Sequence, residues 1–357
     1  MDGERRLASG LLERIGEEGA ARDLPEAFRH IDVSLRGCGA PGAIGHRVVH
    51  GGERFREPTL VDAGVCRAIG ELARLAPLHN PANLLGIEAC LEAYPGVPQV
   101  AVFDTAFHHT LAPRAFRYAV PEDWYRLGVR RYGFHGTSHG YVAERAAALL
   151  GRPLASLNLI TLHLGNGASA AAIENGRCVD TSMGFTPLEG LVMGSRSGDL
   201  DPAVPLFVQR AQGLSADALE ATLNQESGLR GLCGTNDVRE ILARETRGDE
   251  RARLALEIYA YRIRKCIGAY TAVLDRVDAL VFTGGVGENA ARVRELACAG
   301  LARLGIALDA QRNREGAGEA CEIGSLGSPV RVLVVRTDEE LQIARETLAT
   351  VRASRAR

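Results

Sequence analysis

Lysine is almost absent from this chain: Lys265 is the one lysine among 42 basic residues, and the other 41 are arginine. A Walker-type phosphate loop or a Schiff-base mechanism would therefore have to use Lys265. The residues around it, 262–267, have the pattern of an amphipathic helix and not that of a glycine-rich loop. Any phosphate that the protein handles is therefore expected to meet arginine, backbone N–H groups or a metal ion.

Features of membrane, secreted and nucleic-acid-binding proteins are also missing. No apolar run approaches the roughly 18–20 residues that a membrane helix needs. The formal net charge is only −2, so neither nucleic acid nor an anionic membrane is expected as the main partner. The first residues lead into no signal-peptide core, and the eight cysteines form no C-x-x-C pair. The composition therefore predicts a cytoplasmic protein with reduced thiols.

Segments with strand and helix patterns alternate along the chain. Strand patterns occupy residues 43–52, 97–104, 157–163, 279–283 and 330–335, and helical spacing occupies residues 61–75, 81–93, 251–274 and 338–351. This alternation predicts an α/β architecture, and the length of 357 residues suggests about two domains. In such folds, ligands bind beyond the carboxyl ends of strands.

Two glycine-rich turns follow predicted strands, at residues 165–169 and 284–289. Small residues allow a backbone to approach a phosphate closely, and N–H groups at the start of a following helix favour an anion. Both turns are therefore candidates for phosphate binding, although each could also be an ordinary tight turn. Residues 285–290 also fit a dinucleotide fingerprint with Asp309 downstream, but one further strand is too little for a complete dinucleotide-binding half.

Charged side chains of several kinds lie beside predicted turns or element ends. Arg47 and Arg196 are flanked by small or apolar residues that would hold a guanidinium near a cleft, where a phosphoryl group could bind. Asp104 ends a predicted strand and Glu339 begins the last helix, so their carboxylates could bind a hard cation such as Mg²⁺. The alternatives are solvated surface arginines and a glutamate that stabilises a helix N-terminus.

Two histidine pairs have a spacing of four residues. His46 and His50 lie on a strand pattern, where such positions are roughly 13 Å apart and cannot share one ion. The segment that holds His135 and His139 contains a glycine, which argues against an uninterrupted helix and so against zinc. These histidines are expected to be structural or to donate to a reacting oxygen. Ser138 fits a nucleophile-elbow motif, but no buried strand precedes it.

Nine longer motifs run through the chain in order. They are residues 45–52 (GHRVVHGG), 77–81 (PLHNP), 102–108 (VFDTAFH), 131–139 (RYGFHGTSH), 163–169 (HLGNGAS), 180–190 (DTSMGFTPLEG), 194–199 (GSRSGD), 282–289 (FTGGVGEN) and 337–341 (TDEEL). Together they closely resemble the acetokinase family of the sugar kinase/Hsp70/actin superfamily. The resemblance implies two actin-like (ribonuclease H-like) α/β domains with an interdomain cleft. Residues 1–150 would form the first domain, residues 151–335 the nucleotide-binding domain, and residues 336–357 a closing helix on the first domain.

The same resemblance implies reversible phosphoryl transfer between ATP and acetate, giving ADP and acetyl phosphate by direct in-line transfer. It also implies dependence on Mg²⁺, with Mn²⁺ as a substitute, and a homodimer without a nucleic-acid or membrane partner. Propionate or another short-chain acid is an alternative substrate, because one extra methylene changes discrimination by only roughly 1–3 kcal/mol. In-line transfer needs alignment and charge neutralisation more than a covalent nucleophile, so arginines and a divalent cation suit it.

The resemblance also implies roles for single residues. Arg47, Arg196 and His135 would hold the carboxylate and the transferring phosphoryl group. Asp104 would be catalytic and, with Glu339, would position the metal ion. The acid would be bound by Arg47, Val49, Leu78, His79, Phe134 and Pro187. The nucleotide would be bound by His163, Gly165, Asn166, Gly167, Asp237, Val238, Arg239, Gly284, Gly285, Val286, Gly287 and Asn289.

One part of the family pattern has no counterpart in this chain. Family members begin with a strand, an Asn-Ala-Gly-Ser-Ser-Ser-x-Lys phosphate loop and a second strand, whereas residues 6–16 here resemble the third strand. We expect the true start to lie upstream, with an N-terminally truncated first domain in the chain as printed. Such a chain would expose a sheet edge and would be poorly soluble or nearly inactive. A catalytically impaired nucleotide-binding remnant is the alternative.

Overall fold

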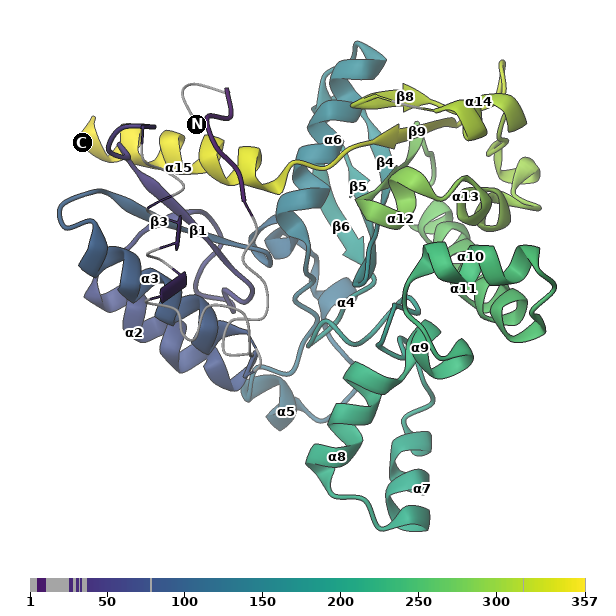
Figure 1. The fold of residues 1–357 in the computed structure, drawn as a ribbon, viewed down its shortest axis with the longest axis horizontal. Coiled ribbons are helices and arrows are strands. Elements are labelled where there is room, and N and C mark those ends of the chain that lie inside the picture. The colour runs from purple at the N-terminus through teal and green to yellow at the C-terminus, as the bar shows by residue number, and fades with distance from the viewer. Residues whose placement is uncertain are drawn as a thin grey trace. The chain divides into compact units, whose positions relative to one another are not determined.

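The structure is a computed structural model, and it describes residues 5–10, 26–27, 30–31, 33, 37–77, 79–316 and 318–356. The chain divides into two compact units, one formed by Met1–Ala106 with Asp338–Arg357 and the other by Phe107–Thr337. Figure 1 shows the helices and strands of both units, most of them with the labels used below. Each unit combines a sheet with helices, as the sequence pattern predicts for an α/β protein.

The first unit contains a three-stranded sheet in the order β1–β3–β2. β1 (Ile44–Val48) and β3 (Gln99–Phe103) are parallel, whereas β2 (Thr59–Leu60) pairs antiparallel with β3. Every residue of β3 is buried, since it is the central strand. The carboxyl ends of β1 and β3 therefore lie at the same edge of this sheet, with Arg47 opposite Val102.

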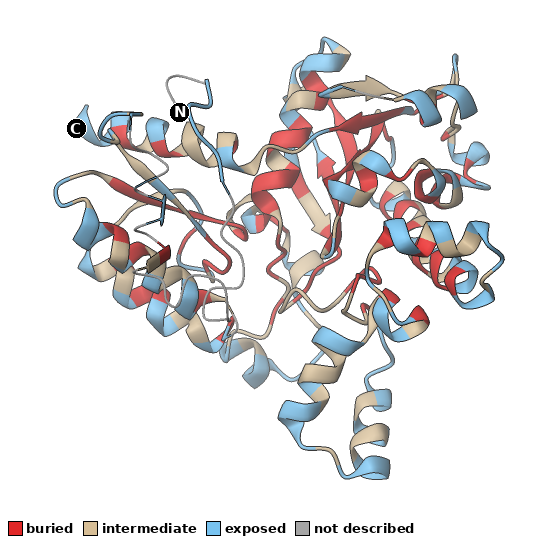
Figure 2. Cartoon of the chain, viewed as in Figure 1, coloured by how far each residue is buried: buried red, intermediate tan, exposed pale blue. Residues whose placement is uncertain are grey.

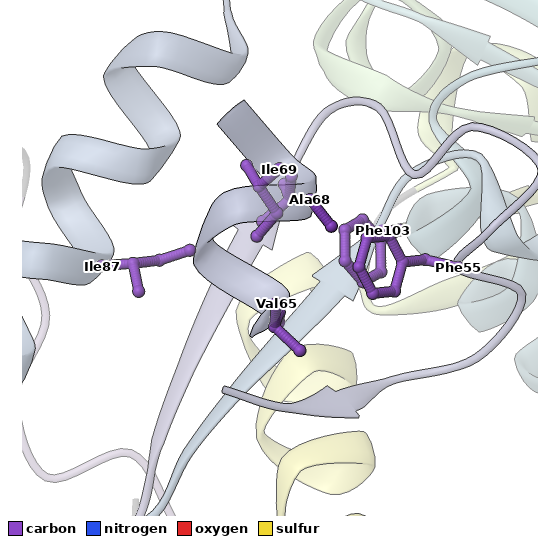
Figure 3. Packing of buried hydrophobic residues seen from close by; sticks show 8 residues of the cluster. Phe55, Val65, Ala68, Ile69, Ile87 and Phe103 are labelled. Atoms are coloured by element: carbon purple, nitrogen blue, oxygen red, sulfur yellow. The ribbon is translucent and has the colours of Figure 1, made fainter. Parts of the chain in front are cut away.

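Helices pack on both faces of β3. Phe103 belongs to a core that it shares with α2 (Ala63–Glu71) and α3 (Asn80–Ala93), and Figure 3 shows this packing from close by. The preceding residue, Val102, belongs to a separate core on the side of α15 (Glu339–Arg355). Successive strand residues point to opposite faces, so the two cores lie on the two sides of the sheet.

Gly45 allows α15 to lie close to β1. A Cβ atom at this position would be 2.4 Å from Thr347 Oγ1 and 2.6 Å from Ile343 Cγ2. Real Cβ atoms do not approach other atoms so closely, and any side chain here would push α15 away from the sheet. The last helix thus packs on β1 and β3, in the unit that contains the earlier part of the chain.

The second unit contains a six-stranded sheet in the order β6–β5–β4–β7–β9–β8. Its strands are β4 (Asn158–Leu164), β5 (Ala168–Glu174), β6 (Arg177–Thr181), β7 (Ala279–Thr283), β8 (Ala320–Glu322) and β9 (Arg331–Val335). β4, β7 and β9 are parallel to one another, and the other pairs are antiparallel. His163 lies opposite Thr283, so the carboxyl ends of β4 and β7 meet at one edge.

Two long helices cover this sheet. α6 (Gly136–Leu150) packs on β4, β7 and β9, and α11 (Glu250–Leu274) packs on β4 and β5. Figure 2 shows that buried residues concentrate in the strands and along these helices. The remaining helices are α4 (Pro113–Phe116), α5 (Glu122–Arg126), α7 (Ala203–Gln212), α8 (Ala216–Ala221), α9 (Gly228–Cys233), α10 (Val238–Thr246), α12 (Gly284–Asn289), α13 (Ala291–Cys298) and α14 (Ala310–Glu315). Short 3₁₀ or π segments occupy Leu72–Arg74, Ala106–Thr110, Leu154–Ser156, Thr222–Glu226 and Ala302–Leu304.

The strands and helices predicted from the sequence pattern form, with ends shifted by a few residues. The expectation that His135 and His139 do not share one uninterrupted helix is confirmed, because His135 lies outside α6 in the left-handed backbone region. α6 begins at the glycine that follows, Gly136, and His135 is its N-cap. A glycine in the first helical position interrupts no interior hydrogen bond, so the helix tolerates it.

The two units divide at Ala106, whereas the sequence analysis places a boundary near residue 150. The difference arises because α6 packs on β4, β7 and β9, which ties the residues before 150 to the second unit. Most of the segment 6–16 lies outside the described residues. Within the described ranges, every helix is too short or too polar to cross a lipid bilayer.

Candidate active site

Arg47, Asp104 and Glu339 form a charged cluster in the first unit. Arg47 lies near the end of β1, Asp104 directly follows β3, and Glu339 is the first residue of α15. Nε and Nη2 of Arg47 donate to Oδ1 and Oδ2 of Asp104 at 3.0 and 2.5 Å. Oε2 of Glu339 lies 3.8 Å from Arg47 Nε. The structure thus brings together three residues that the sequence analysis selected.

Burial and charge set the electrostatics of this cluster. The side chain of Asp104 is fully buried, whereas that of Arg47 is 43% exposed and that of Glu339 is 26% exposed. The negative charge of Asp104 raises the pKa of Arg47, which keeps the guanidinium charged. Burial and then the neighbouring Asp104 carboxylate raise the pKa of Glu339. Two carboxylates beside one arginine leave excess negative charge that a cation would neutralise.

Asp104 and Glu339 are the residues that could hold a divalent cation. Among the described residues, no group of three or more His, Cys, Asp or Glu side chains is placed to hold a metal ion. Mg²⁺ does not need such a cage, because it commonly uses one or two carboxylates together with water and phosphate oxygens. The hard oxygen donors and the raised pKa of Glu339 therefore fit a magnesium ion that arrives with a nucleotide.

Two asparagines of α3 hold the backbone that follows β1. Asn83 Oδ1 accepts the N–H of Val49 at 3.0 Å, and the carbonyl of His79 accepts the N–H of Asn83 at 3.0 Å. Asn80 exchanges two further hydrogen bonds with the backbone after Val49. These contacts tie the backbone at Val49 to the first turn of α3, which follows His79. The sequence analysis assigned neither asparagine a role, although Asn80 lies in the motif at 77–81 and Asn83 in the helical pattern that follows. Leu78 lies outside the described residues.

His135, Gly167 and Arg196 come together in the second unit. His135 caps α6 in the left-handed backbone region, at a φ of 56°, which residues other than glycine rarely adopt. A Cβ atom on Gly167 would lie 3.3 Å from His135 Nε2 and 3.5 Å from Arg196 Nη1. The imidazole Nε2 and the guanidinium therefore border the same small space beside a residue without a side chain.

Arg196 has no carboxylate partner among the described residues. Its Nη1 donates to the carbonyl of Pro187 at 3.0 Å and to Met193 Sδ at 3.7 Å. Burial lowers the pKa of Arg196, and no negative charge opposes this effect. A partly buried guanidinium without a counter-ion favours the binding of an anion.

A cluster that sequence reasoning missed holds the loop around Pro187. Arg131 Nη2 donates to Glu189 Oε1 at 2.5 Å, and its Nη1 donates to two carbonyls of the same loop. The Tyr118 hydroxyl also donates to Glu189, and burial raises the pKa of this tyrosine. The cluster therefore fixes the carbonyl of Pro187 that orients Arg196. Arg131 and Glu189 each lie in one of the nine motifs, but they are far apart in the sequence, so nothing there indicates that they pair.

Besides Pro187, Phe134 is the residue of the second unit that was predicted to bind the acid. Its side chain is 1% exposed, and its carbonyl accepts a hydrogen bond from His108 Nε2 at 2.9 Å. Burial lowers the pKa of His108 to about 4, so this histidine is neutral at pH 7 and can donate from one ring nitrogen only. The segment just before His135 is thereby fixed to the protein core.

The two glycine-rich turns lie at one edge of the six-stranded sheet, after β4 and β7. Gly284 has a φ of +76°, and a Cβ atom there would lie 2.7 Å from the carbonyl oxygen of Leu164, so only glycine fits. Oε1 of Glu288 accepts the N–H of Gly284 at 2.9 Å, which means that the chain itself satisfies this donor. At Gly285, in contrast, no atom of the described residues, apart from its chain neighbours and the backbone of its own helix, lies within 4 Å of the Cβ position.

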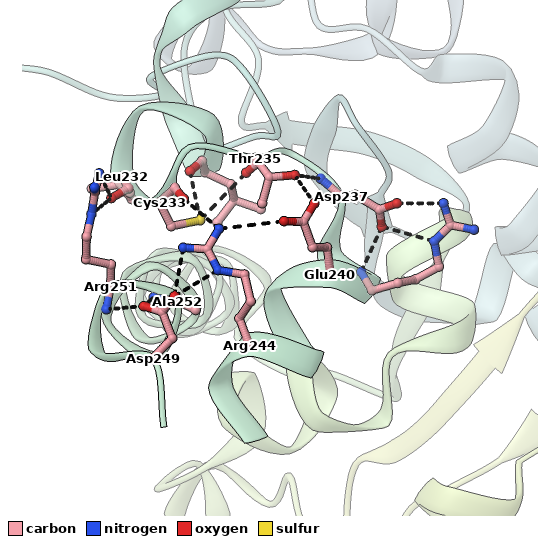
Figure 4. Close-up of polar contacts among 11 residues, drawn as sticks. Leu232, Cys233, Thr235, Asp237, Glu240, Arg244, Asp249, Arg251 and Ala252 are labelled. Atoms are coloured by element: carbon pink, nitrogen blue, oxygen red, sulfur yellow. Dashed lines mark hydrogen bonds and ion pairs between the residues drawn. The ribbon is translucent and has the colours of Figure 1, made fainter. Parts of the chain in front are cut away.

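Asn166 links the first turn to two other loops. Its Oδ1 accepts Nδ2 of Asn236 at 2.9 Å, and its carbonyl accepts the N–H of Gly194 at 2.9 Å. Asp237, labelled in Figure 4, follows Asn236 and caps α10. It accepts two hydrogen bonds from the Arg239 guanidinium. This pairing lowers the pKa of Asp237 to about 2. The structure thus brings two groups of predicted nucleotide residues, at 166 and at 237–239, close together.

His163 lies beside His135, with ring centroids 4.3 Å apart and nearly parallel planes. Its Nδ1 is 2.8 Å from Ser138 Oγ. Ser138 is buried within α6 and does not lie on a turn between a strand and a helix, which agrees with the expectation that it is not a nucleophile elbow. The remaining residues predicted for the nucleotide lie on α10, on α12 and in the first turn. They are Val238, Val286, Gly287, Asn289 and Gly165.

Comparison with known proteins first defines the class of the protein. Residues 40–345 match the model of the Acetokinase family, and the chain belongs to this family. The prediction that the protein is an enzyme of this kinase family is therefore confirmed.

The individual relatives are acetate and propionate kinases. An acetate kinase of Syntrophobacter fumaroxidans is 54% identical, over 99% of this chain and 93% of its own. The crystal structure of Porphyromonas gingivalis acetate kinase is 45% identical and has a TM-score of 0.89, covering 93% of this chain and 86% of that one. A propionate kinase from Francisella tularensis is 43% identical with a TM-score of 0.88, covering 92% and 85%. This likeness confirms the predicted α/β fold of two actin-like domains.

Proposed function

We propose that the protein catalyses reversible transfer of the γ-phosphoryl group of ATP to the carboxylate of acetate, giving acetyl phosphate and ADP. One observation carries the proposal: Arg196 is a partly buried cation without a carboxylate partner among the described residues, beside the Nε2 of His135. Two such donors suit the oxygens of a phosphoryl group in transfer. The names of the relatives, acetate kinase and propionate kinase, support a short carboxylic acid as the acceptor.

For this reaction the protein has to align the acetate with the γ-phosphoryl group and neutralise the negative charge of that group. A carboxylate oxygen of acetate bonds to the γ-phosphorus while the bond from that phosphorus to the ADP oxygen breaks, and no proton has to move. Arg47, oriented by its two hydrogen bonds to Asp104, would bind the acetate carboxylate. Arg196 and His135 would stabilise the charge on the phosphoryl group. These roles suit direct in-line transfer from ATP to the acid.

A magnesium ion, with manganese as a substitute, would be held by Glu339 and Asp104 together with phosphate oxygens of the nucleotide. When bound, it would supply charge neutralisation at those oxygens. The support is the pair of carboxylates and the raised pKa of Glu339, which a neighbouring cation would bring back down. Arg47 holds the carboxylate of Asp104 in one orientation through two hydrogen bonds.

The nucleotide and the acid would meet different parts of the chain. The Asn166 turn would lie along the phosphates, and the open space at Gly285 with residues 237–239 would accept the adenosine. Val49 and Phe134 are buried apolar residues that would limit the size of the acid, with Leu78 and Pro187. Because one methylene is worth only roughly 1–3 kcal/mol, we expect propionate as a secondary substrate. The motif resemblance also implies a cytoplasmic location and a homodimer. Sedimentation of the purified protein would test the homodimer.

A hydroxamate assay tests the proposed reaction. Hydroxylamine traps an acyl phosphate, so the protein with ATP, MgCl₂ and acetate should form acetohydroxamate in step with ADP. Arg196→Ala should lower kcat by about a thousandfold, because an arginine that neutralises a transferring phosphoryl group contributes at least about 10³. Arg126→Ala is the control, since Arg126 is 72% exposed and forms a surface ion pair with Asp123.

Two outcomes would count against the proposal. Absence of hydroxamate with acetate, propionate and butyrate, in a protein that still binds ATP, would favour a nucleotide-binding remnant. Equal activity of Arg196→Ala and the wild type would remove the role given to the arginine, even if acetyl phosphate forms.

A further inference from the structure

A chain of hydrogen bonds runs from His135 into the core of the second unit. His135 Nδ1 lies 2.8 Å from Ser169 Oγ, and the same oxygen lies 2.8 Å from His139 Nε2. His139 Nδ1 in turn lies 2.7 Å from Thr161 Oγ1. Ser169, His139 and Thr161 have no exposed surface, so the chain of bonds ends inside the protein.

Thr161 sets the direction of these bonds. Within the described part of the protein, the hydroxyl of Thr161 has one hydrogen-bond partner, His139 Nδ1. If this hydroxyl only accepted a hydrogen bond, its own proton would be buried without a partner, which is unfavourable. Thr161 therefore donates, and His139 Nδ1 accepts.

His139 passes this direction on to Ser169. Burial, and then the neighbouring His108 and His163, hold the pKa of His139 well below its usual value, so its ring is neutral at pH 7. A neutral imidazole that accepts at Nδ1 carries its proton on Nε2. His139 Nε2 therefore donates to Ser169 Oγ, which leaves the Ser169 proton to be donated to His135 Nδ1.

The last bond determines the state of His135. Because Nδ1 of His135 accepts from Ser169, the neutral ring carries its proton on Nε2. Nε2 is the atom that borders the space at Gly167 beside Arg196 Nη1. Three buried residues that touch no substrate thus decide which nitrogen of His135 presents a proton to that space.

We propose that Thr161, His139 and Ser169 are positioning residues that hold His135 in one tautomer, with its proton on Nε2. In this state His135 donates a hydrogen bond to the anion beside Arg196 and does not act as a base. The identity of that anion, a phosphoryl group, rests on the proposed function. The tautomer itself does not, because it follows from the bonds inside the protein.

Nitrogen-15 NMR of the full chain, labelled at the histidine rings, reads this tautomer directly. The signals of His135 are those that disappear in His135→Gln. We expect the wild type to show a protonated Nε2 and an unprotonated Nδ1 on this ring. Thr161→Val keeps the side-chain shape but removes the terminal donor, so both tautomers of His135 should become populated.

Kinetics provide a second readout. In Thr161→Val, kcat for acetyl phosphate formation should fall about threefold to tenfold with little change in KM, as expected for the loss of one neutral hydrogen bond. Thr161→Ser should restore both the tautomer and the rate. Thr181→Val is the matched control, because Thr181 is a buried strand residue whose hydroxyl donates to the carbonyl of Ala170 and to no histidine.

The outcomes separate this inference from the proposed function. A proton on Nδ1 of wild-type His135 would overturn the inference even in an enzyme that makes acetyl phosphate. So would an unchanged tautomer in Ser169→Ala, which removes the donor to His135 directly and decides the matter if Thr161→Val does not fold. Failure of the proposed function would look different: the Nε2 tautomer would be present, and no acetyl phosphate would form.

Discussion

Replacing Arg294 by methionine should lower the free energy of unfolding by about 4 kcal/mol. Arg294 lies on α13, is 2% exposed and is among the largest fully buried side chains of the described residues. Its guanidinium donates to the side chain and the carbonyl of Asn313 at 2.7 and 2.6 Å, and to the carbonyls of Gly287 and Glu288 at 2.9 Å each. Methionine fills similar space and donates none of these hydrogen bonds.

The magnitude follows from the four acceptors that lose their donor. A buried acceptor left without a partner costs about 1–3 kcal/mol, and we use the lower end, about 1 kcal/mol for each. The lower end applies because burial already disfavours the charged guanidinium, as its lowered pKa shows, and the substitution removes that cost. For a unit of this size, the loss corresponds to a Tm lower by roughly 8–16 °C.

Urea unfolding followed by circular dichroism measures the effect, with Arg292→Met as the matched control. Arg292 lies on the same helix, is 45% exposed and forms surface ion pairs with Glu245 and Glu295, so its replacement should cost less than about 1 kcal/mol. The KM for ATP should also rise in Arg294→Met, because Gly287 and Glu288 belong to α12. Similar urea midpoints for Arg294→Met and Arg292→Met would refute the reasoning, since the acceptors of Arg294 would then have found other hydrogen-bond donors.

Three further substitutions test other parts of the account. Asp104→Asn should lower kcat in the hydroxamate assay about 10- to 100-fold, because hydrogen bonds to charged groups contribute about 1.5–3 kcal/mol. An amide accepts only one of the two N–H groups that Arg47 presents. An unchanged kcat would show that Arg47 needs no partner. Gly45→Val should lower the Tm by several degrees, since its side chain would strike α15 and overpacking costs about 1–3 kcal/mol; a Tm equal to that of the wild type would contradict the close packing. Glu339→Gln should raise the Tm at pH 7, because the pKa of Glu339 is raised in the folded state and its ionisation therefore destabilises the fold as the pH rises. This gain should vanish below the unfolded pKa of about 4.3, so thermal melts that show the same gain at pH 3.5 would contradict the assignment.

The strands and long helices are predictable because their patterns are local. β3, β7 and β9 are short, largely apolar runs that each contain valine, and α11 keeps helical spacing over its whole length. The position of the two glycine-rich turns is also predictable, because they follow strands that proved to be parallel neighbours. The residues alone indicate an enzyme that handles phosphate, and only the nine motifs point to acetate.

Contacts between distant positions are not predictable in this way. Arg294 looks like an ordinary surface arginine in the sequence, and Arg131 opens a motif without a sign of its partner. Only the fold buries them against Asn313 and Glu189. The state of His135 is equally hidden, since it depends on its left-handed backbone and on hydroxyl groups of neighbouring strands. Such features arise from tertiary packing, which composition and periodicity do not encode.

Phosphorus-31 NMR of the purified protein with ATP, Mg²⁺ and acetate tests the central claim most directly. The account predicts that ATP decreases while ADP and acetyl phosphate appear in equal amounts, and that ADP with acetyl phosphate regenerates ATP. Persistence of ATP, or its conversion to ADP and inorganic phosphate without acetyl phosphate, would contradict the claim.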